Sequence, residues 1–331
     1  VGRIDEQALK VLDSSNYRGT SHIGKIGIEK TYEDLLHGTV GHQQVETTAQ
    51  GRVLRVLNRT PPVSGHNLYL SLDSGVQAAA EQAFGDFAGT AIAMDPNNGD
   101  ILAFVSMPTY DPNPFVNGIE YSAYAALKEN DKEPLFNRAL RGQYPPGSTV
   151  KPFMGLAGLE RGITSSHSST YCPGFYMLPG NSRKFRDWKR TGHGTVNLNK
   201  SIVQSCDVYF YDLALSLGID SIHEYLGQFG FGRRTGIDIL GELPGLLPSR
   251  KWKRARRDQP WFPGETIITG IGQGFFLTTP TQLAVATAAL ANGGRIMQPK
   301  IVHADQAASS SELSPHHPRQ IENITIGNQL H

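Results

Sequence analysis

Hydrophobic residues recur first with the period of a strand and then with that of a helix over residues 67–106. Leu68, Leu70 and Leu72 alternate with other residues, which predicts a strand. Asp73 stands where an N-cap would open a helix over 74–84, whose apolar residues fall on one face. Strands at 89–94 and 101–106 follow, joined by Asp-Pro-Asn-Asn-Gly-Asp, a sequence typical of a hairpin turn. This part of the chain predicts the start of a sheet.

The residues before and after this segment predict further elements. Residues 1 to about 60 predict a small module with β-rich stretches at 20–27 and 51–58 and a helical patch at 28–36. Mostly helices are predicted over 118–230, including an apolar one at 208–217. A helix at 280–292, a strand at 295–302 and a loop at 304–318 complete the pattern. We place the domain boundary so that 1–66 and 67–331 form separate units.

Composition excludes several classes of protein. Of 331 residues, 39% are hydrophobic and 18% are charged, with 31 Lys and Arg against 30 Asp and Glu. We expect no nucleic-acid partner, because such a domain would carry a marked basic excess. No run of about 18 apolar residues occurs, so the sequence itself holds no candidate membrane span. Since the chain opens with Val1 and not Met, we expect a piece of a longer protein, whose membrane anchor could have been left out.

The segment Tyr-Pro-Pro-Gly-Ser-Thr-Val-Lys-Pro at 144–152 carries the sharpest chemical signal. Pro-Pro-Gly ends an extended stretch, so Ser148 falls at the first turn of a helix and Lys151 lies on the same face. A serine becomes a strong nucleophile when a neighbouring base takes its proton, and a lysine can be that base. The backbone N–H groups of the same turn can stabilise an acyl oxyanion. The alternative is that Ser148 only caps a helix.

A second polar pair precedes the apolar helix at 208–217. Ser205 and Asp207 flank Cys206 at the entrance of this helix, where their side chains either cap it or point into a cleft. Ser-x-x-Lys followed by Ser-x-Asn or a variant, and then by Lys-[Ser/Thr]-Gly, is the plan of serine acyl-transferases that act on penicillin. Capping remains the alternative for both residues.

Segments along nearly the whole chain are similar to this family. They are Gly-Ile-Glu-Lys at 27–30, Leu-Ser-Leu-Asp at 70–73, Ala-Met-Asp-Pro at 93–96, Gly-Asp-Ile-Leu-Ala at 99–103, the motif at 144–152, Gly-Ile-Gly-Gln-Gly at 270–274, and Thr-Pro at 279–280. Together they resemble the penicillin-binding protein 2 family, the elongation-specific class B transpeptidases of Gram-negative bacteria. The resemblance implies a mixed α/β fold, with an antiparallel sheet flanked by helices, an all-helical lobe and an N-terminal pedestal.

The resemblance also implies an activity and roles for single residues. Ser148 is similar to the acylated nucleophile and Lys151 to its general base, while Ser205 and Asp207 would relay the proton and hold the substrate. The implied activity is a D-Ala-D-Ala transpeptidase that cross-links peptidoglycan stem peptides during cell elongation and is a target of β-lactams. No cofactor for catalysis is expected. A D-Ala-D-Ala carboxypeptidase, a β-lactamase-related hydrolase or a non-catalytic lactam sensor or scaffold are the alternatives.

Partners and location follow from the same resemblance. It implies a membrane glycan polymerase and scaffold proteins of the rod complex as partners. It also implies a place on the periplasmic face of the inner membrane, with an N-terminal anchor helix outside this sequence.

Two departures from the family pattern stand out. Asp207 replaces the Asn of many relatives, which adds a negative charge to the cleft. The third motif is missing, since the only similar strings are Arg-Thr-Gly at 190–192 and 234–236. Both precede Gly-Ile-Gly-Gln-Gly, whereas the family's motif follows it. We therefore interpret both as chance matches and expect the true motif beyond His331.

Two thiols, a carboxylate and an imidazole occur within 35 residues. Cys172, Asp187, His193 and Cys206 form a credible tetrahedral zinc set. Their spacing is not that of a zinc finger, and a Cys172–Cys206 disulfide or unconnected residues are the alternatives. Some members of the resembled family hold a structural zinc in this region, which favours one structural zinc here.

The stretch Arg-Lys-Trp-Lys-Arg-Ala-Arg-Arg at 250–257 is the one dense run of charge. Such a run is usually a solvated face. The functional alternatives are contact with an anionic glycan precursor, with an anionic membrane or with an acidic protein surface.

Overall fold

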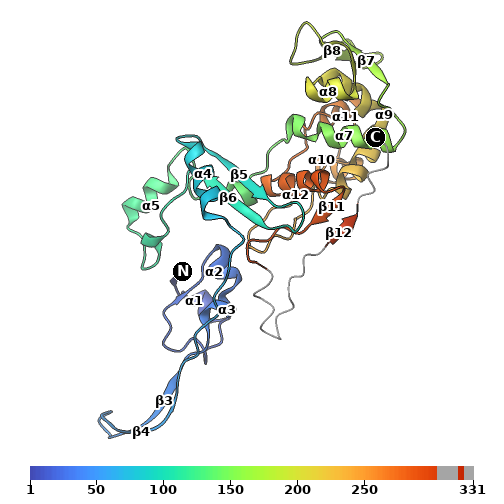
Figure 1. Cartoon of the computed structure of the whole chain (residues 1–331). Coiled ribbons are helices and arrows are strands. Elements are labelled where there is room, and N and C mark those ends of the chain that lie inside the picture. The colour runs from blue at the N-terminus through green and yellow to red at the C-terminus, as the bar shows by residue number, and fades with distance from the viewer. Residues whose placement is uncertain (304–319, 324–331) are drawn as a thin grey trace.

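The N-terminal module is built from short elements and an extended hairpin. The computed structural model describes residues 1–303 and 320–323. The elements of the module are β1 (Gly2–Arg3), α1 (Glu6–Leu9), β2 (His22–Ile23), α2 (Gly27–Thr31), α3 (Glu33–His37), β3 (His42–Thr47) and β4 (Val53–Thr60). β1 pairs with β2 and β3 with β4, both antiparallel. The β3–β4 hairpin projects from the molecule (Figure 1), and every residue of β4 is exposed.

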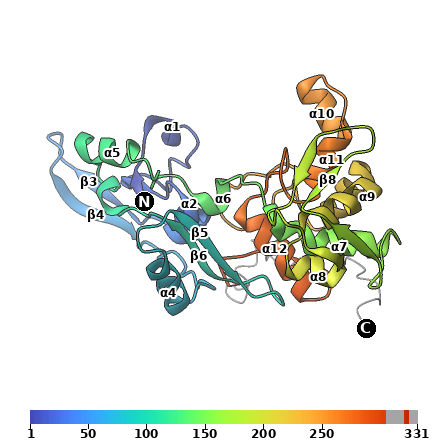
Figure 2. The ribbon, with the colours of Figure 1, turned by 90° about the horizontal axis from the view of Figure 1, so that it is seen from above.

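A second hairpin with helices on both sides forms the centre of the molecule. Its strands are β5 (Gly89–Met94) and β6 (Ile101–Met107), which pair antiparallel. Helix α4 (Ser74–Phe84) packs against β6, and α12 (Pro280–Ala291) packs against β5 (Figure 2). The Asp73 side chain accepts the N–H groups of Gly75 and Val76, so the predicted N-cap of α4 is confirmed. The predicted hairpin is confirmed as well.

The predicted strand at Leu68–Leu72 is wrong, since only Leu70 forms a single bridge, to Val302. The burial is the reverse of the predicted alternation, because Leu70 is 42% exposed while Ser71 is buried. The hydroxyl of Ser71 lies 2.9 Å from the Ile101 carbonyl oxygen, and its N–H donates to the Ile301 carbonyl. Ser71 therefore connects β6 to the segment after α12. The alternating leucines do not form a buried face.

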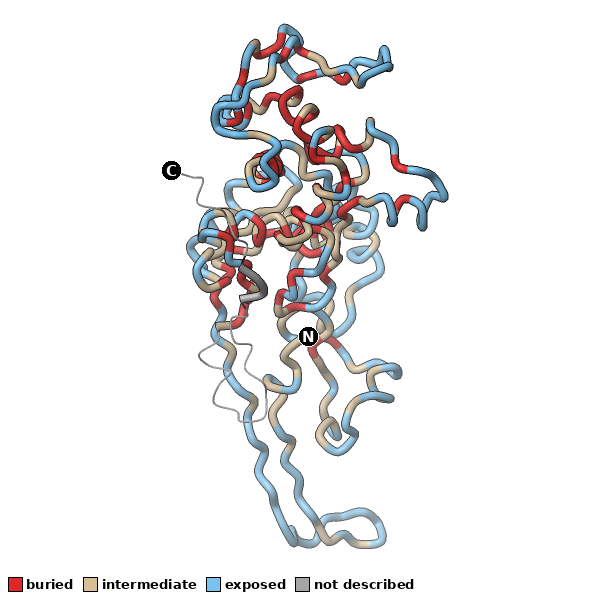
Figure 3. The backbone as a smooth tube through the Cα atoms, turned by 90° about the vertical axis from the view of Figure 1, so that its right-hand side faces the viewer, coloured by how far each residue is buried: buried red, intermediate tan, exposed pale blue. Residues whose placement is uncertain are grey.

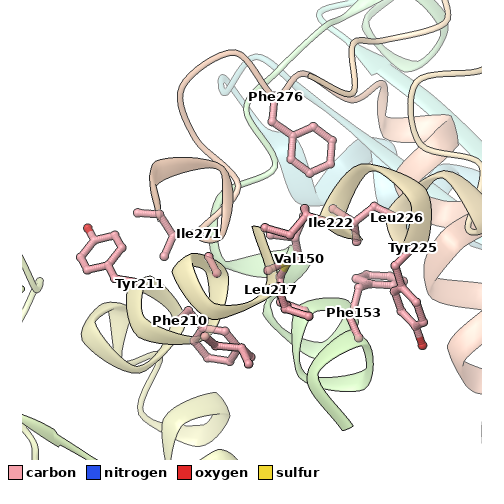
Figure 4. Packing of buried hydrophobic residues seen from close by; sticks show 14 of the residues in the cluster. Val150, Phe153, Phe210, Tyr211, Leu217, Ile222, Tyr225, Leu226, Ile271 and Phe276 are labelled. Carbon is pink, nitrogen blue, oxygen red and sulfur yellow. The ribbon is translucent and has the colours of Figure 1, made fainter. Parts of the chain in front are cut away.

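The lobe at the other end of the molecule holds the main hydrophobic core. Its elements include η2 (Gly147–Val150), α7 (Lys151–Glu160), α8 (Leu198–Val203), α9 (Asp207–Gln228), α10 (Arg250–Arg257) and α11 (Pro263–Thr269). α9 packs against both α7 and α11 and kinks at Gly218, where φ is +74°. Figure 4 shows Phe153 of α7, Phe210 and Leu226 of α9 and Phe276 within one cluster. Burial concentrates in this lobe (Figure 3), as expected of a packed core.

The lobe also carries strands that the sequence did not predict. They are β7 (Ser169–Cys172), β8 (Phe175–Met177), β9 (Lys184–Arg186) and β10 (Gly194–Asn197). β7 pairs with β10 and β8 with β9. Each has only three or four residues, too few for a period-two pattern to emerge. The lobe is therefore mostly helical and not all-helical.

The connections around the core include the short elements η1 (Asn113–Phe115), α5 (Tyr121–Lys128) and α6 (Arg138–Arg141). The strand predicted at 295–302 is present only as β11 (Arg295–Met297), which pairs with β12 (Gln320–Asn323). Pro299 has no N–H for a ladder, and residues 300 and 302 form isolated bridges instead. The loop predicted at 304–318 lies outside the described residues.

The mixed α/β class is confirmed, with helices around small antiparallel sheets. Within the described residues, no helix combines the length and the hydropathy needed to cross a bilayer.

Candidate active site and metal-ligand cluster

Ser148 lies in a 3₁₀ turn that leads directly into α7. The sequence predicted that Ser148 lies in the first turn of a helix, and the 3₁₀ form of this turn has a local cause. Pro152 has no N–H to donate to the Ser148 carbonyl in the α-helical pattern, and the N–H of Lys151 donates to it with 3₁₀ spacing. Ser148 is exposed, whereas Lys151 is only 1% exposed. The turn thus presents a hydroxyl to solvent and sends the amine inward.

A glycine contact from another segment holds this turn. The N–H of Gly147 donates to the carbonyl of Gly272 at 2.9 Å. Gly272 has φ of +70°, and a Cβ there would lie 2.2 Å from the Gly147 carbonyl oxygen. A side chain at Gly272 would therefore push the turn that carries Ser148 away. The sequence analysis identified the Gly-Ile-Gly-Gln-Gly segment as similar to the family but did not predict its contact with Gly147.

The Lys151 amine is surrounded by oxygen atoms. It donates to Asp207 Oδ1 at 2.7 Å, to the Ser205 carbonyl at 2.9 Å and to Ser205 Oγ at 3.0 Å. Ser205 Oγ in turn donates to Ser148 Oγ at 3.0 Å. The structure therefore brings all four predicted residues together, with Ser205 between Lys151 and Ser148. The Phe210 ring lies 5.5 Å from the Lys151 Nζ and covers the amine from the core side.

The backbone conformation of Ser205 directs its side chain toward both Lys151 and Ser148. It lies between α8 and α9 with φ of +51°, a conformation that is uncommon for a residue other than glycine. Cys206 is the N-cap of α9 and makes no side-chain cap bond. The side chains of Ser205 and Asp207 thus contact Lys151 and do not cap the helix.

Trp188 is a part of this site that the sequence analysis missed. Its indole N–H lies 3.1 Å from the Gln204 carbonyl and 3.2 Å from the Ser205 carbonyl, and its backbone N–H donates to Asp207 Oδ2 at 3.3 Å. The only signal in the sequence is its position next to the predicted metal ligand Asp187. Trp188 therefore connects the predicted metal ligands to the polar cluster around Lys151.

The four predicted metal ligands form one buried cluster. The ligand atoms of Cys172, Asp187, His193 and Cys206 all lie within 4.8 Å of one another. Asp187 Oδ2 is 3.5 Å from Cys172 Sγ and 3.4 Å from Cys206 Sγ, and His193 Nδ1 is 3.6 Å from Cys172 Sγ. In a tetrahedral zinc site with bonds of about 2.0–2.3 Å, neighbouring ligand atoms lie roughly 3.3–3.8 Å apart. These three distances therefore fit a zinc site, and both cysteines are free thiols in this structure.

Two residues of this cluster, Cys206 and Asp187, have shifted pKa values. Burial raises the pKa of the Cys206 thiol, and Cys172 and Asp187 beside it raise it further. Burial acts to raise the pKa of Asp187, but the N–H groups of Lys189 and Val208, the Cys206 thiol and His193 together lower it. A bound cation would favour the thiolate forms that protein alone disfavours.

The two Arg-Thr-Gly strings lie in loops and not on strands. Gly192 packs at the Cys172 carbonyl, and Thr235 bonds to the buried Glu242 carboxylate at 2.7 Å. Neither string reaches the Ser148 cluster through a hydrogen bond between described residues, and their interpretation as chance matches stays a prediction.

Comparison with known proteins gives two family matches. Residues 89–327 match the model of the penicillin binding protein transpeptidase domain, and residues 1–70 match that of the penicillin-binding protein dimerisation domain. A relative from Acinetobacter baumannii named peptidoglycan D,D-transpeptidase MrdA is 50% identical over 308 residues, which cover 93% of this chain and 46% of the relative.

Solved structures resemble the fold over most of the chain. The crystal structure of Pseudomonas aeruginosa PBP2 in complex with WCK 5153 has a TM-score of 0.86 at 48% identity and covers 98% of this chain and 66% of that one. The complex between PBP2 and MreC from Helicobacter pylori has a TM-score of 0.85 at 37% identity, covering 92% and 56%. The chain spans about half the length of the curated relatives it matches.

Proposed function

Because this chain belongs to the penicillin-binding protein transpeptidase family, we propose that it carries the acyl-transfer site of a peptidoglycan DD-transpeptidase that acts in cell elongation. The observation that carries the proposal is the chain of contacts from the exposed Ser148 hydroxyl through Ser205 to the buried Lys151 amine and Asp207. A nucleophile linked to a base, which a third group orients, is the arrangement that acyl transfer needs.

The first half of the reaction makes an acyl-enzyme. Before this step Lys151, which forms an ion pair with Asp207 in the structure, releases one proton to solvent. Ser148 Oγ then attacks the carbonyl carbon between the two D-Ala residues of a stem peptide, and its proton passes to Ser205 as the Ser205 proton passes to the Lys151 amine. Hydroxyl groups both donate and accept, so rotation of the two hydroxyl hydrogens allows this direction of transfer. The amide bond breaks, and the terminal D-Ala leaves with a proton on its nitrogen. N–H groups of the turn around Ser148 would stabilise the oxyanion.

The second half transfers the acyl group. An amine of a neighbouring stem peptide attacks the Ser148 ester, a new amide bond forms, and the proton of the amine returns to Ser148 through the same groups. A β-lactam would acylate Ser148 by opening its ring, and the opened ring would stay attached. Asp207 holds Lys151 through its ion pair, a role in which an Asn would supply a hydrogen bond without the charge.

A direct test measures labelling and cross-linking in parallel. The full-length protein that carries this chain is exposed to a fluorescent β-lactam and, separately, to glycan strands with pentapeptide stems, with Ser148→Ala as the control. The proposal predicts labelling, D-Ala release and cross-linked stems, all lost in Ser148→Ala. D-Ala release without cross-links would indicate a carboxypeptidase, and labelling without either would indicate a lactam sensor.

We also propose one structural zinc at Cys172, Asp187, His193 and Cys206. Four protein ligands complete a tetrahedral shell, which is the arrangement of structural and not of catalytic zinc. Cys206 lies between Ser205 and Asp207, so the metal would fix the segment that presents both to Lys151. The burial of all four ligands supports this proposal, and the rival disulfide would leave Asp187 and His193 without a role.

Partners and location are proposals of the same kind. The Helicobacter pylori complex of PBP2 with MreC supports an MreC-like scaffold partner for the protein that carries this chain. A membrane glycan polymerase as a second partner, and anchoring on the periplasmic face of the inner membrane, follow from the family. The matched dimerisation domain at residues 1–70 is the first place to look for the scaffold contact.

A further inference from the structure

Helix α10 is fixed to the lobe by one face. The Trp252 ring packs against Phe275 with centroids 5.1 Å apart. Lys253 is 1% exposed, forms an ion pair with Glu265 of α11 and lies 4.4 Å from the centre of the Phe262 ring. These contacts determine which side of α10 faces outward, so the arrangement of its other cations is set by packing.

The outward face of α10 carries unmatched positive charge. Its exposed cations are Lys251, Arg254, Arg256 and Arg257, together with Arg250. In the part of the chain that the structure describes, ion pairs reach α10 at two places, Arg250 with Asp220 at 2.8 Å and Lys253 with Glu265. Lys251, Arg254, Arg256 and Arg257 form no ion pair between described residues, so an anionic ligand would meet four cations without a carboxylate partner.

This charged face belongs to the same structural unit as the nucleophile's turn. The Arg257 guanidinium lies 5.8 Å from the centre of the Phe275 ring. Phe275 follows the Gly270–Gly274 segment, in which Gly272 accepts the N–H of Gly147 next to Ser148. Figure 2 shows α10 projecting at the edge of the lobe beside α11. A polymer bound along α10 would thus be held by the unit that also supports the active site.

We propose that the outward face of α10 binds the carboxylates of a peptidoglycan strand outside the catalytic cleft, an inference that rests on the proposed function. The stem peptides of this polymer carry free carboxylates at short intervals. Four of the five exposed cations are arginines, whose planar guanidinium groups match carboxylates in bidentate pairs. The patch would keep the polymer near Ser148 between successive reactions.

Two other anionic partners fit the helix less well. A helix that lies in a membrane interface needs an exposed apolar face, but the one large apolar side chain of α10, Trp252, packs inward on Phe275. A protein interface needs an apolar or aromatic centre, which the exposed residues of α10 do not supply. A hydrated polyanion requires neither, so the charge pattern favours the peptidoglycan strand.

Co-sedimentation with purified, protein-free peptidoglycan tests the proposal. All proteins carry Ser148→Ala, so that no covalent bond forms and binding is measured apart from chemistry. The test variant changes four cations to Gln, at Lys251, Arg254, Arg256 and Arg257. The matched control changes four exposed cations elsewhere to Gln, at Lys10, Arg52, Arg59 and Lys128. We expect about tenfold weaker binding for the test variant and no change for the control, because four exposed ion pairs each add little and tenfold is about 1.4 kcal/mol.

Four further measurements make the result decisive: binding to amidated peptidoglycan, the effect of salt, the properties of the α10 variant with Ser148 intact, and binding to phosphatidylglycerol vesicles. Peptidoglycan with its carboxylates converted to neutral amides should lose the same binding, and added salt should weaken the binding of the untreated polymer. The α10 variant with Ser148 intact should keep its rate of labelling by a β-lactam, measured at a temperature where its melting curve shows it folded, because the variant also loses the Arg257 contact with Phe275. Equal binding by the test variant and its parent would overturn the proposal, as would a preference for phosphatidylglycerol vesicles over peptidoglycan. Failure of Ser148 labelling would contradict the proposed function alone, since sedimentation needs no acylation.

Discussion

Two buried lysines of the same lobe, one in the proposed reactive site and one in a structural contact, have partly similar surroundings. Lys151 and Lys253 are each 1% exposed, and each pairs with a carboxylate, Asp207 and Glu265 respectively. Burial and an ion pair are thus common to both. The difference lies in their other neighbours. Lys151 donates to the hydroxyl and carbonyl of Ser205, and this hydroxyl leads to the exposed Ser148. Lys253 instead faces the rings of Trp261, Phe262 and Phe275.

The comparison teaches that a buried, paired lysine is by itself no indicator of catalysis. Aromatic faces stabilise a cation but offer no path for a proton. A hydroxyl that reaches a solvent-exposed nucleophile offers such a path. We therefore interpret Lys151 as part of the reaction and Lys253 as the clamp between α10 and α11, and the two can be compared by the same substitution.

The largest expected effect is on acylation in Lys151→Ala. Without a base, the rate of labelling by a β-lactam should fall about 10²–10⁴-fold, the range that general-base assistance contributes. Stopped-flow or gel-based labelling at a temperature where the variant is folded measures this rate. Labelling at the parental rate would show that Lys151 is only a packing residue.

Lys253→Ala should show the opposite pattern. Removal of one partner leaves Glu265 unpaired next to aromatic rings, which should lower the free energy of unfolding by about 3 kcal/mol. The labelling rate of the folded variant should stay close to that of the parent. Denaturant unfolding and labelling at low temperature separate the two quantities. A loss of acylation as large as that of Lys151→Ala would remove the distinction between the two lysines.

The proposed zinc should stabilise the part of the lobe that carries Ser205 and Asp207. Zinc at about 100 times its dissociation constant should stabilise the native state by about 2.7 kcal/mol. His193→Ala should lose zinc, measured by elemental analysis of protein purified without added metal, and should melt at a lower temperature. His167→Ala, at an exposed histidine, is the control. Only trace zinc in the parent, with a mass two protons below the reduced value, would establish the disulfide instead.

The smallest expected effects on stability and acylation come from removing the indole N–H group of Trp188 or of Trp261. Trp188→Phe removes the donor to the Gln204 and Ser205 carbonyls and should cost about 1 kcal/mol of stability and slow acylation. Trp261→Phe removes the donor to the Thr266 hydroxyl at 2.8 Å and should cost a similar stability without slowing acylation. Melting curves and labelling rates of the pair measure this. Equal rates in both variants would mean that Trp188 does not position Ser205.

Sequence patterns predicted the elements that neighbouring residues determine, such as a helix with an N-cap residue or a hairpin with a short turn. Asp73 caps α4 at the predicted residue, and the turn between β5 and β6 determines their pairing. The four short strands β7–β10 escaped prediction because their partners lie up to 28 residues away, as in the pairing of Asn197 with Ser169. Leu68–Leu72 misled because Ser71 is buried through bonds to residues about 30 and 230 positions further along the chain.

The candidate site divides in the same way. Motifs identified Ser148, Lys151, Ser205 and Asp207, and the family resemblance implied a proton relay through Ser205 and Asp207. No local pattern gave the contacts that place Ser205 between Lys151 and Ser148, because they depend on its positive φ. Lys253 was hidden in a run of cations, and only the packing of α10 shows that it faces inward while its neighbours face solvent.

The most direct test of the central claim is the mass spectrum of the protein after exposure to a β-lactam. We predict one adduct per chain, which peptide mapping places on Ser148 and which is absent from Ser148→Ala. The labelled peptide should become scarce in Ser205→Ala as well, because the link from Ser148 to Lys151 is broken. An adduct on another residue, or labelling that persists in Ser148→Ala, would contradict the account.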